Sequence, residues 1–168
     1  MSIGIRPYRS GDAETIIKWC KDEESFYKWS AGILGDYPIT LKRFEESTSG
    51  RYDSRKFFPW VMFDGDDVIG YFIMRHPGDD MSEIRFGFVI VDPSRRGQGM
   101  GRKMLNLGIK FAFEVYGAKL ITLGVFENNP SARRCYEAVG FKPYAGESFE
   151  VNGNMWNCIE MKLEKANG

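Results

Sequence analysis

The stretch EIRFGFVIVDPSRRGQGMGRKM, residues 83–104, decides the fold, because it runs from a buried strand through a glycine-rich turn into a helix. Residues 83–91 are almost wholly apolar in their second half, which is typical of a central strand covered on both faces. The helix, from about Gly99 to Tyr116, carries one apolar stripe. Another apolar strand follows at residues 120–126. Together these segments predict a strand–turn–helix–strand unit with two parallel strands.

The turn before this helix has the chemistry of an anion-binding site. Gly97, Gly99 and Gly101 let the backbone approach a ligand closely and adopt unusual φ and ψ angles. The first N–H groups of a helix have no partner within it, and the helix dipole adds about half a positive charge there. A diphosphate suits such a turn, and a tight turn without a ligand also fits the letters. Three side chains would add full charges: Arg95, Arg96 and Arg102.

Two other phosphate-binding turns fit the spacing poorly. A P-loop requires Gly-Lys followed by Ser or Thr, whereas Gly101 is followed by Arg102 and Lys103. A Rossmann turn requires G-x-G-x-x-G, whereas these glycines follow G-x-G-x-G. Both nucleotide-binding interpretations are therefore disfavoured.

The rest of the chain predicts one domain over residues 1–168. Residues 26–38 are aromatic, contain glycines and are expected to be irregular, while Thr40 and Asn129 are expected helix caps. Further helices are expected from Ser10, from Leu41 to about Ser49, and from Pro130 to Gly140. Further strands, joined in part by hairpin turns at Gly65 and Gly153, are expected at residues 3–8, 57–63, 68–74, 141–150 and 155–163.

Composition favours a cytoplasmic protein without a nucleic-acid or membrane partner. Lys and Arg number 23, as do Asp and Glu, so there is no net charge to attract a polyanion. The first residues hold no long apolar run, so neither a signal peptide nor a membrane anchor is expected. The cysteines lack zinc-ligand spacing, so reduced thiols and no metal are expected. His76 is the only histidine, which leaves a Ser-His-Asp or Cys-His mechanism almost without support.

Two motifs give the chain a family resemblance. Residues 96–101, RGQGMG, match the pattern Gln/Arg-x-x-Gly-x-Gly/Ala. Residues 129–141, NPSARRCYEAVGF, match Asn-x-x-Ala-x-x-x-Tyr-x-x-x-Gly-Phe at every letter. From about Phe57 to Phe141, the chain therefore resembles the GNAT superfamily of acetyl-CoA-dependent N-acetyltransferases. The resemblance implies an α/β (α+β) fold: a mixed, mostly antiparallel twisted sheet of about seven strands, with a central splayed parallel pair and helices on both faces.

The resemblance also implies how acetyl-CoA would be held as cosubstrate. The backbone N–H groups of the glycine turn would bind the pyrophosphate, and the pantetheine arm would bond to the backbone of Val89 and Val91 like an added strand. A bulge near residues 88–90 would splay the two parallel strands. Asn128 would meet the coenzyme from the next strand end, or serve only as a turn residue. The turn residues implied are Arg96, Gly97, Gln98, Gly99, Gly101 and Arg102.

Two residues are the candidates for catalysis. By resemblance, the Tyr136 hydroxyl would protonate the departing thiolate; the alternative is a ring that only packs on the coenzyme. Glu83 is the candidate base that deprotonates the acceptor amine, with an exposed strand-end carboxylate as the alternative. The expected reaction is direct attack of the amine on the thioester in a ternary complex. A backbone N–H near Val89 would stabilise the oxyanion.

The acceptor is expected to be a small-molecule or peptide amine, and a homodimer is left open. Its pocket should be lined by residues 26–37 and by the turn between the last two strands. Acidic side chains there, at residues 22–24 and at Asp36, would attract a cationic amine or simply be solvated. Aromatic candidates are Trp29, Tyr37 and Trp156. The alternative function is a non-catalytic acyl-CoA-binding or sensing module on the same fold.

Overall fold

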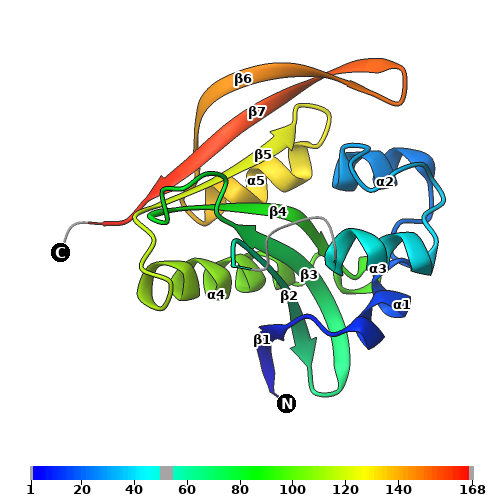
Figure 1. The fold of residues 1–168 in the computed structure, drawn as a ribbon, viewed down its shortest axis with the longest axis horizontal. Coiled ribbons are helices and arrows are strands. Elements are labelled where there is room, and N and C mark those ends of the chain that lie inside the picture. The colour runs from blue at the N-terminus through cyan, green and yellow to red at the C-terminus, as the bar shows by residue number, and fades with distance from the viewer. Residues whose placement is uncertain (1, 50–54, 167–168) are drawn as a thin grey trace.

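The computed structural model describes residues 2–49 and 55–166. The strands among these residues form one seven-stranded sheet in the order β1-β2-β3-β4-β5-β7-β6 (Figure 1). Neighbouring strands are antiparallel except for the central pair β4 and β5, which is parallel. This confirms the predicted fold class. The strands are β1 (Ile3–Pro7), β2 (Phe57–Asp64), β3 (Asp67–Arg75), β4 (Glu83–Val91), β5 (Leu120–Phe126), β6 (Lys142–Val151) and β7 (Asn154–Glu164). The helices are η1 (Ser10–Asp12), α1 (Ala13–Ile16), α2 (Glu23–Ser30), α3 (Leu41–Ser49), η2 (Pro93–Arg95), α4 (Met100–Glu114) and α5 (Pro130–Ala138).

Helix α2 corrects the expectation that residues 26–38 are irregular. The Asp22 carboxylate accepts the Ser25 N–H at 2.7 Å and so caps the helix. Phe26 and Tyr27 bury one face of it. The glycines that suggest a loop, Gly32 and Gly35, follow Ala31, whose left-handed conformation (φ 55°) ends the helix.

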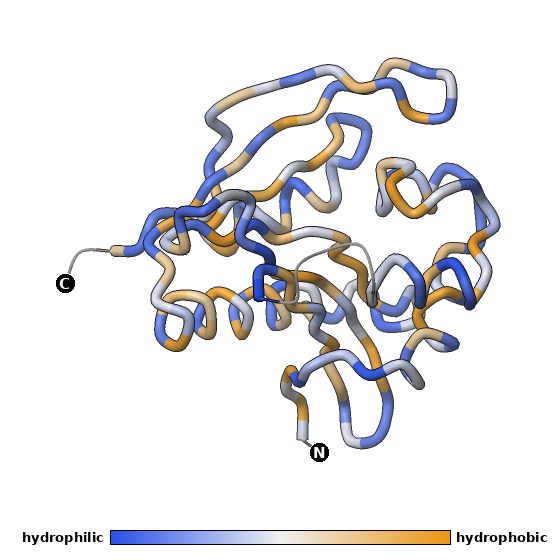
Figure 2. The backbone as a smooth tube through the Cα atoms, viewed as in Figure 1, coloured by the Kyte–Doolittle hydropathy of each residue, from blue (hydrophilic) through white to orange (hydrophobic). Residues whose placement is uncertain are grey.

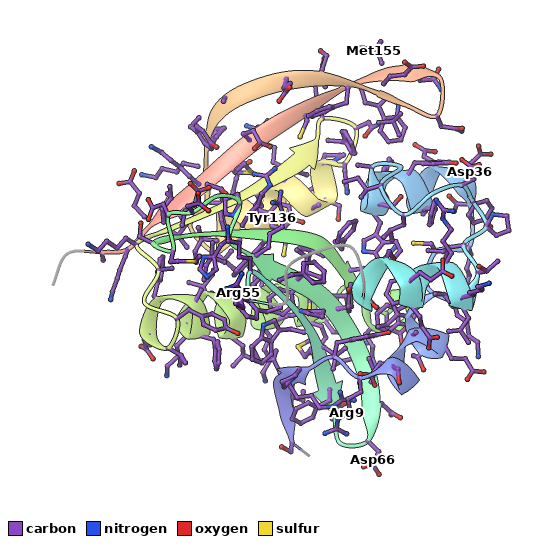
Figure 3. The ribbon with its side chains drawn as sticks, viewed as in Figure 1. Arg9, Asp36, Arg55, Asp66, Tyr136 and Met155 are labelled. Carbon is purple, nitrogen blue, oxygen red and sulfur yellow. The ribbon has the colours of Figure 1, made fainter. Side chains whose placement is uncertain are left out.

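Side-chain alternation along the strands divides the core into two layers. Met62 and Phe72 pack on the α4 and α5 side, whereas their neighbours Val61 and Tyr71 pack under α1 to α3. In Figure 2, hydrophobic strands alternate with hydrophilic turns, such as the one at the β2–β3 tip, where Figure 3 labels Asp66. Helices therefore cover both faces of the sheet, as predicted.

The central parallel pair stays together over only three residue pairs. Glu83 pairs with Leu120 and Arg85 with Thr122, and no later pair joins β4 to β5 in the described chain. On its other side, β4 carries a bulge. Gly87 pairs with Ile73 and Ile90 with Tyr71, so an advance of three residues along β4 matches two along β3. The bulged Phe88 has φ 50°. The predicted bulge and splay are therefore present, and they open the sheet at its centre.

The β6–β7 hairpin extends past the sheet and reaches α2. In β6 every residue except Val151 is exposed. The side chain of Asn152, in the predicted hairpin turn, donates to Glu23 of α2 at 2.5 Å. Figure 3 shows Met155 at the outer end of this hairpin. The tip of the hairpin and α2 thus lie side by side (Figure 1).

No helix in the described residues has the length and apolar character needed to cross a membrane. Within the same residues, no group of three or more His, Cys, Asp or Glu side chains is arranged to hold a metal ion.

Candidate active site

A cleft of about 770 Å³ opens where β4 and β5 splay apart. Its walls are α2 on one side, the two splayed strands at the centre, and the first turns of α4 and α5 on the other side. The volume lies in the range of ligand-binding pockets. The cleft gathers residues from both predicted motifs, which makes it the candidate active site.

The glycine turn presents a row of free amides to this cleft. The first hydrogen bond into α4 runs from Lys103 N–H to Gly99 C=O at 3.1 Å. Within the described chain, the N–H groups of residues 97–102 have no backbone partner. Gly97 and Gly99 have φ 78° and 76°, which side-chain-bearing residues rarely adopt. These amides at a helix start form an anion cradle, as the sequence predicts.

Three guanidinium groups around the cleft are available to a phosphate. Among the described residues, Arg96, Arg102 and Arg134 have no ion-pair partner, and all three line the cleft. Arg95 also lines it, but its side chain is bound to Asp64 at 2.8 Å. The Arg96 backbone N–H, expected to bind the pyrophosphate, instead donates to the Pro93 carbonyl at 3.4 Å. Arg96 can therefore contact a phosphate through its side chain but not through this N–H.

Arg134 is a cleft residue that the sequence analysis missed. It lies in α5, two positions before Tyr136, and no motif letter falls on it. The available signal was helical geometry, because Ser131, Arg134 and Cys135 share one face of α5 and all line the cleft.

The backbone of β4 faces the splay at the two predicted valines. The Asp92 N–H bonds to the Ile69 carbonyl of β3 at 2.9 Å. Backbone polar groups alternate in direction along a strand, so those of Val91 face away from β3, while Val89, beside the bulge, has no strand partner among the described residues. Both valines line the cleft. Their N–H and C=O groups are therefore free to bind an extended ligand.

Tyr136 lies at the inner part of the cleft, near the centre of the molecule (Figure 3). The residue is 7% exposed, and its ring packs edge-on against Phe141 with centroids 6.2 Å apart. Burial raises its pKa above that of a free phenol. The hydroxyl is therefore protonated at neutral pH and can act as a proton donor, not as a base.

Three predicted residues do not line the cleft: Glu83, Gln98 and Asn128. Glu83 lies at the paired end of β4, where its carboxylate accepts a bond from the Thr122 hydroxyl at 3.1 Å. Its carbonyl lies 2.9 Å from His76 Nδ1. Gln98 and Asn128 are exposed, and Asn129 lines the cleft where Asn128 was expected.

Two thiols line the cleft, but neither is a ready nucleophile. Burial raises the pKa of Cys20 to about 11, and burial also raises the pKa of Cys135. Both are therefore protonated at neutral pH, and a thiol is a much weaker nucleophile than a thiolate. The raised thiol pKa values therefore disfavour an acyl-cysteine intermediate.

Helix α2 contributes one of the three aromatic residues expected at the acceptor pocket. Trp29 lines the cleft with its helix neighbours Ser25 and Lys28. Tyr37 instead donates its hydroxyl to the Lys21 carbonyl at 2.9 Å, and Trp156 packs against Phe126 with ring centroids 5.1 Å apart.

The acidic residues at the start of α2, and Asp36 beyond its end, do not line the cleft. The Asp22 carboxylate caps α2, and Glu24 pairs with Lys28 at 3.0 Å. No Asp or Glu is among the described residues that line the cleft. The carboxylates expected to attract a cationic amine therefore lie elsewhere, and the charged side chains that line the described cleft are those of Lys and Arg.

The residues present fit acetyl-CoA. Free amides and unpaired guanidinium groups lie at one end, where the pyrophosphate would bind. Unpaired strand backbone follows, suited to the pantetheine amides, and a protonated phenol lies beyond it. Methyl groups built on Gly97 and Gly99 would meet no protein atom within 4 Å, so the turn has room for a ligand.

Comparisons with known proteins identify the family and related sequences. The family model of the acetyltransferase (GNAT) domain matches residues 2–142. A mycothiol acetyltransferase from Corynebacterium efficiens is 29% identical over 125 residues, which cover 74% of this chain and 40% of that protein. A spermine/spermidine N(1)-acetyltransferase from Bacillus subtilis is 41% identical over 63 residues, which cover 38% of this chain and 40% of that protein. The matches thus span less than half the length of these curated relatives.

Solved structures share the fold. A spermidine N-acetyltransferase from Vibrio cholerae, in complex with CoA and spermine, superposes with a TM-score of 0.80 and 19% identity, covering 96% of this chain and 95% of that one. Since the family model covers most of the chain and both motifs meet in one cleft, the chain belongs to the GNAT acetyltransferase domain family.

Proposed function

We propose that this protein transfers the acetyl group of acetyl-CoA to the primary amine of a small molecule. One observation carries the proposal: the row of free amides at residues 97–102 opens into a cleft that also holds the Tyr136 hydroxyl. An anion cradle and a proton donor in one cleft suit a diphosphate-bearing thioester.

In this proposal each cleft residue has a physical task. The amides of the turn, with Arg96 and Arg102, bind the pyrophosphate, and Arg134 adds a third cation for the phosphates. Val89 and Val91 bind the pantetheine arm through their backbone. The Val89 N–H donates to the thioester oxygen as negative charge develops there. Tyr136 donates its proton to the departing thiolate; burial raises the pKa of this phenol, which keeps it protonated but makes it a weaker acid, so donation depends on its position in the cleft.

The acceptor loses its proton to solvent in this proposal, since no carboxylate lines the described cleft. The rate should therefore rise with pH until the acceptor is neutral. It should show no titration of Tyr136 between pH 6 and 9, because that phenol stays protonated.

The names of the relatives support one class of acceptor. The relatives are named as a mycothiol acetyltransferase, a spermine/spermidine N(1)-acetyltransferase and a spermidine N-acetyltransferase, names that refer to small molecules. This supports a small amine over a protein N-terminus as the first class to test.

The deciding experiment is a panel of amines incubated with acetyl-CoA and scored by release of free thiol. The panel should include polyamines, amino acids, amino sugars and a peptide N-terminus. Turnover with at least one small amine, well above hydrolysis without amine, is expected. Binding of acetyl-CoA by calorimetry without turnover on any amine would instead support the sensing module. Absence of binding would remove the assignment of the turn.

A further inference from the structure

One side chain of α2 reaches across the cleft to the bulge of the central strand. The indole N–H of Trp29 donates to the carbonyl oxygen of Phe88 at 2.8 Å. The two rings meet edge to face, with centroids 6.2 Å apart. This contact joins residues 59 positions apart and connects the acceptor-side helix to the strand that would hold the thioester.

The bulge needs such support. Phe88 has φ 50°, a left-handed conformation that residues other than glycine rarely adopt. A strained conformation of this kind persists only where the surrounding structure fixes it. Trp29 is itself fixed, because its ring stacks on Phe44 at 6.1 Å and meets Tyr71 edge-on at 6.4 Å. The indole is therefore a rigid donor.

The hydrogen bond also sets the direction of a second group. The Phe88 carbonyl and the Val89 N–H belong to one planar peptide unit, and in a trans peptide they point in opposite directions. Holding the carbonyl toward α2 therefore aims the Val89 N–H the other way. A donor on the carbonyl also polarises the peptide and strengthens the N–H as a donor.

We propose that Trp29 is a positioning residue for acetyl transfer, which orients the Val89 N–H toward the thioester oxygen through the Phe88–Val89 peptide. This inference rests on the proposed function. It assigns α2 a role in the chemical step as well as in forming a wall of the acceptor pocket. Without the indole, the carbonyl could rotate toward the developing oxyanion, and its negative end would oppose that charge.

The test is Trp29→Phe, which keeps an aromatic ring and removes the N–H. We expect kcat to fall about tenfold, less than the 10²- to 10³-fold typical of losing an oxyanion donor outright. The KM for acetyl-CoA should stay within about twofold, because the phosphates are held at the glycine turn. The matched control is Trp60→Phe: the Trp60 indole N–H is buried without a hydrogen-bond partner in the described chain, and the residue does not line the cleft.

Two results with the variants would overturn the proposal. One is a Trp29→Phe enzyme with kcat within twofold of the unmodified enzyme; the other is an equal loss of kcat in Trp60→Phe. A measurement on the unmodified protein guards against a variant that does not fold. The Trp29 indole proton should shift in the NMR spectrum when acetyl-CoA is added, while the Trp60 proton should not.

An indole proton of Trp29 that does not move on saturation with acetyl-CoA also overturns the proposal. Failure of the proposed function gives a different pattern. In that case the unmodified protein acetylates no amine in the panel, while the indole shift still reports whether Trp29 senses the coenzyme.

Discussion

Two regions of the molecule differ in how the sequence specifies their contacts. One is the coenzyme segment, residues 57–141, and the other is the pair of flanking segments, residues 2–49 and 142–166. In the coenzyme segment, the key contacts are made by backbone groups within a short stretch of chain, such as the amides that follow Arg96. In the flanking segments, they are made by side chains far apart in sequence, such as Trp29 with Phe88 and Asn152 with Glu23.

This difference explains what each part contributes. A backbone cradle depends on glycines at fixed spacing, so it leaves a readable motif and suits a cosubstrate shared by a whole family. Long-range side-chain contacts leave no local motif, and they suit the part of the site that varies with the acceptor. Substitutions in the two regions should therefore fail in different ways.

The largest effect is expected from Gly99→Val in the coenzyme segment. Val would have to adopt φ near 76° and would place a branched side chain in the anion cradle. Binding of acetyl-CoA, measured by calorimetry, should weaken by about 10²-fold or more, the equivalent of losing two charge-assisted hydrogen bonds.

Gly117→Val is the matched control for this substitution. Gly117 has φ 75° and equally open surroundings, but it follows α4 at the far end from the cleft. Both variants carry the same backbone strain and should lose similar stability, whereas only Gly99→Val should lose the coenzyme. Equal binding by the two variants would remove the cradle from the site.

Tyr136→Phe should have the next largest effect, and should act on the chemical step alone. Turnover should fall about 10²-fold, the usual contribution of a positioned acid, while affinity for acetyl-CoA barely changes. Tyr116→Phe is the control, because burial raises the pKa of Tyr116 too, but that residue lies outside the cleft. If Tyr136→Phe turns over normally, the ring only packs on the coenzyme.

How far the sequence predicts the structure follows the same division. The bounds predicted for β4 and β5 match the structure, since apolar runs ended by Asp92-Pro93 and by the second motif mark them clearly. Helix α2 was missed, although Asp22 followed by Glu23 and Glu24 is a helix-start signal. Aromatic residues and nearby glycines obscured it, because only tertiary packing shows which aromatic face is buried.

The candidate site divides in the same way. Backbone positions such as Gly99 and Val89 line the cleft as the motif implies. Whether an exposed side chain between motif positions lines the cleft, as Arg134 does, cannot be predicted from motif spacing alone. Their direction depends on how α5 is rotated against β5, which the motif does not encode.

Gly124→Ala tests the place where the two regions meet, because Gly124 of the coenzyme segment pairs with Glu160 of the flanking strand β7. Its effect should be moderate. A methyl group at Gly124 would lie 2.6 Å from Glu160 and 3.0 Å from Arg85, whose side chains form a two-bond ion pair across β5 at 2.8 and 3.0 Å. Overpacking of this kind costs about 1 to 3 kcal/mol of stability, measurable by urea unfolding.

The control for this junction is Gly146→Ala in β6, where the added methyl would meet nothing closer than 3.8 Å. It should leave stability nearly unchanged. Because Gly124 also lines the cleft, its variant should raise the KM for the acceptor several-fold while the coenzyme still binds. Unchanged stability in Gly124→Ala would mean that the ion pair simply moves aside.

The smallest effect is expected from Glu83→Gln, at the paired end of β4. Glu83 lies six residues before Val89, and at about 3.3 Å per residue the two are roughly 20 Å apart along the strand. Its carboxylate already accepts the Thr122 hydroxyl, a bond that Gln can also accept, so turnover should fall less than about threefold and the pH profile should keep its shape. A base at this position would instead lose most rate at low pH, where deprotonating the amine limits the reaction. Such a profile would restore Glu83 as the base, and would mean that the acceptor reaches the paired end of β4, beyond the cleft.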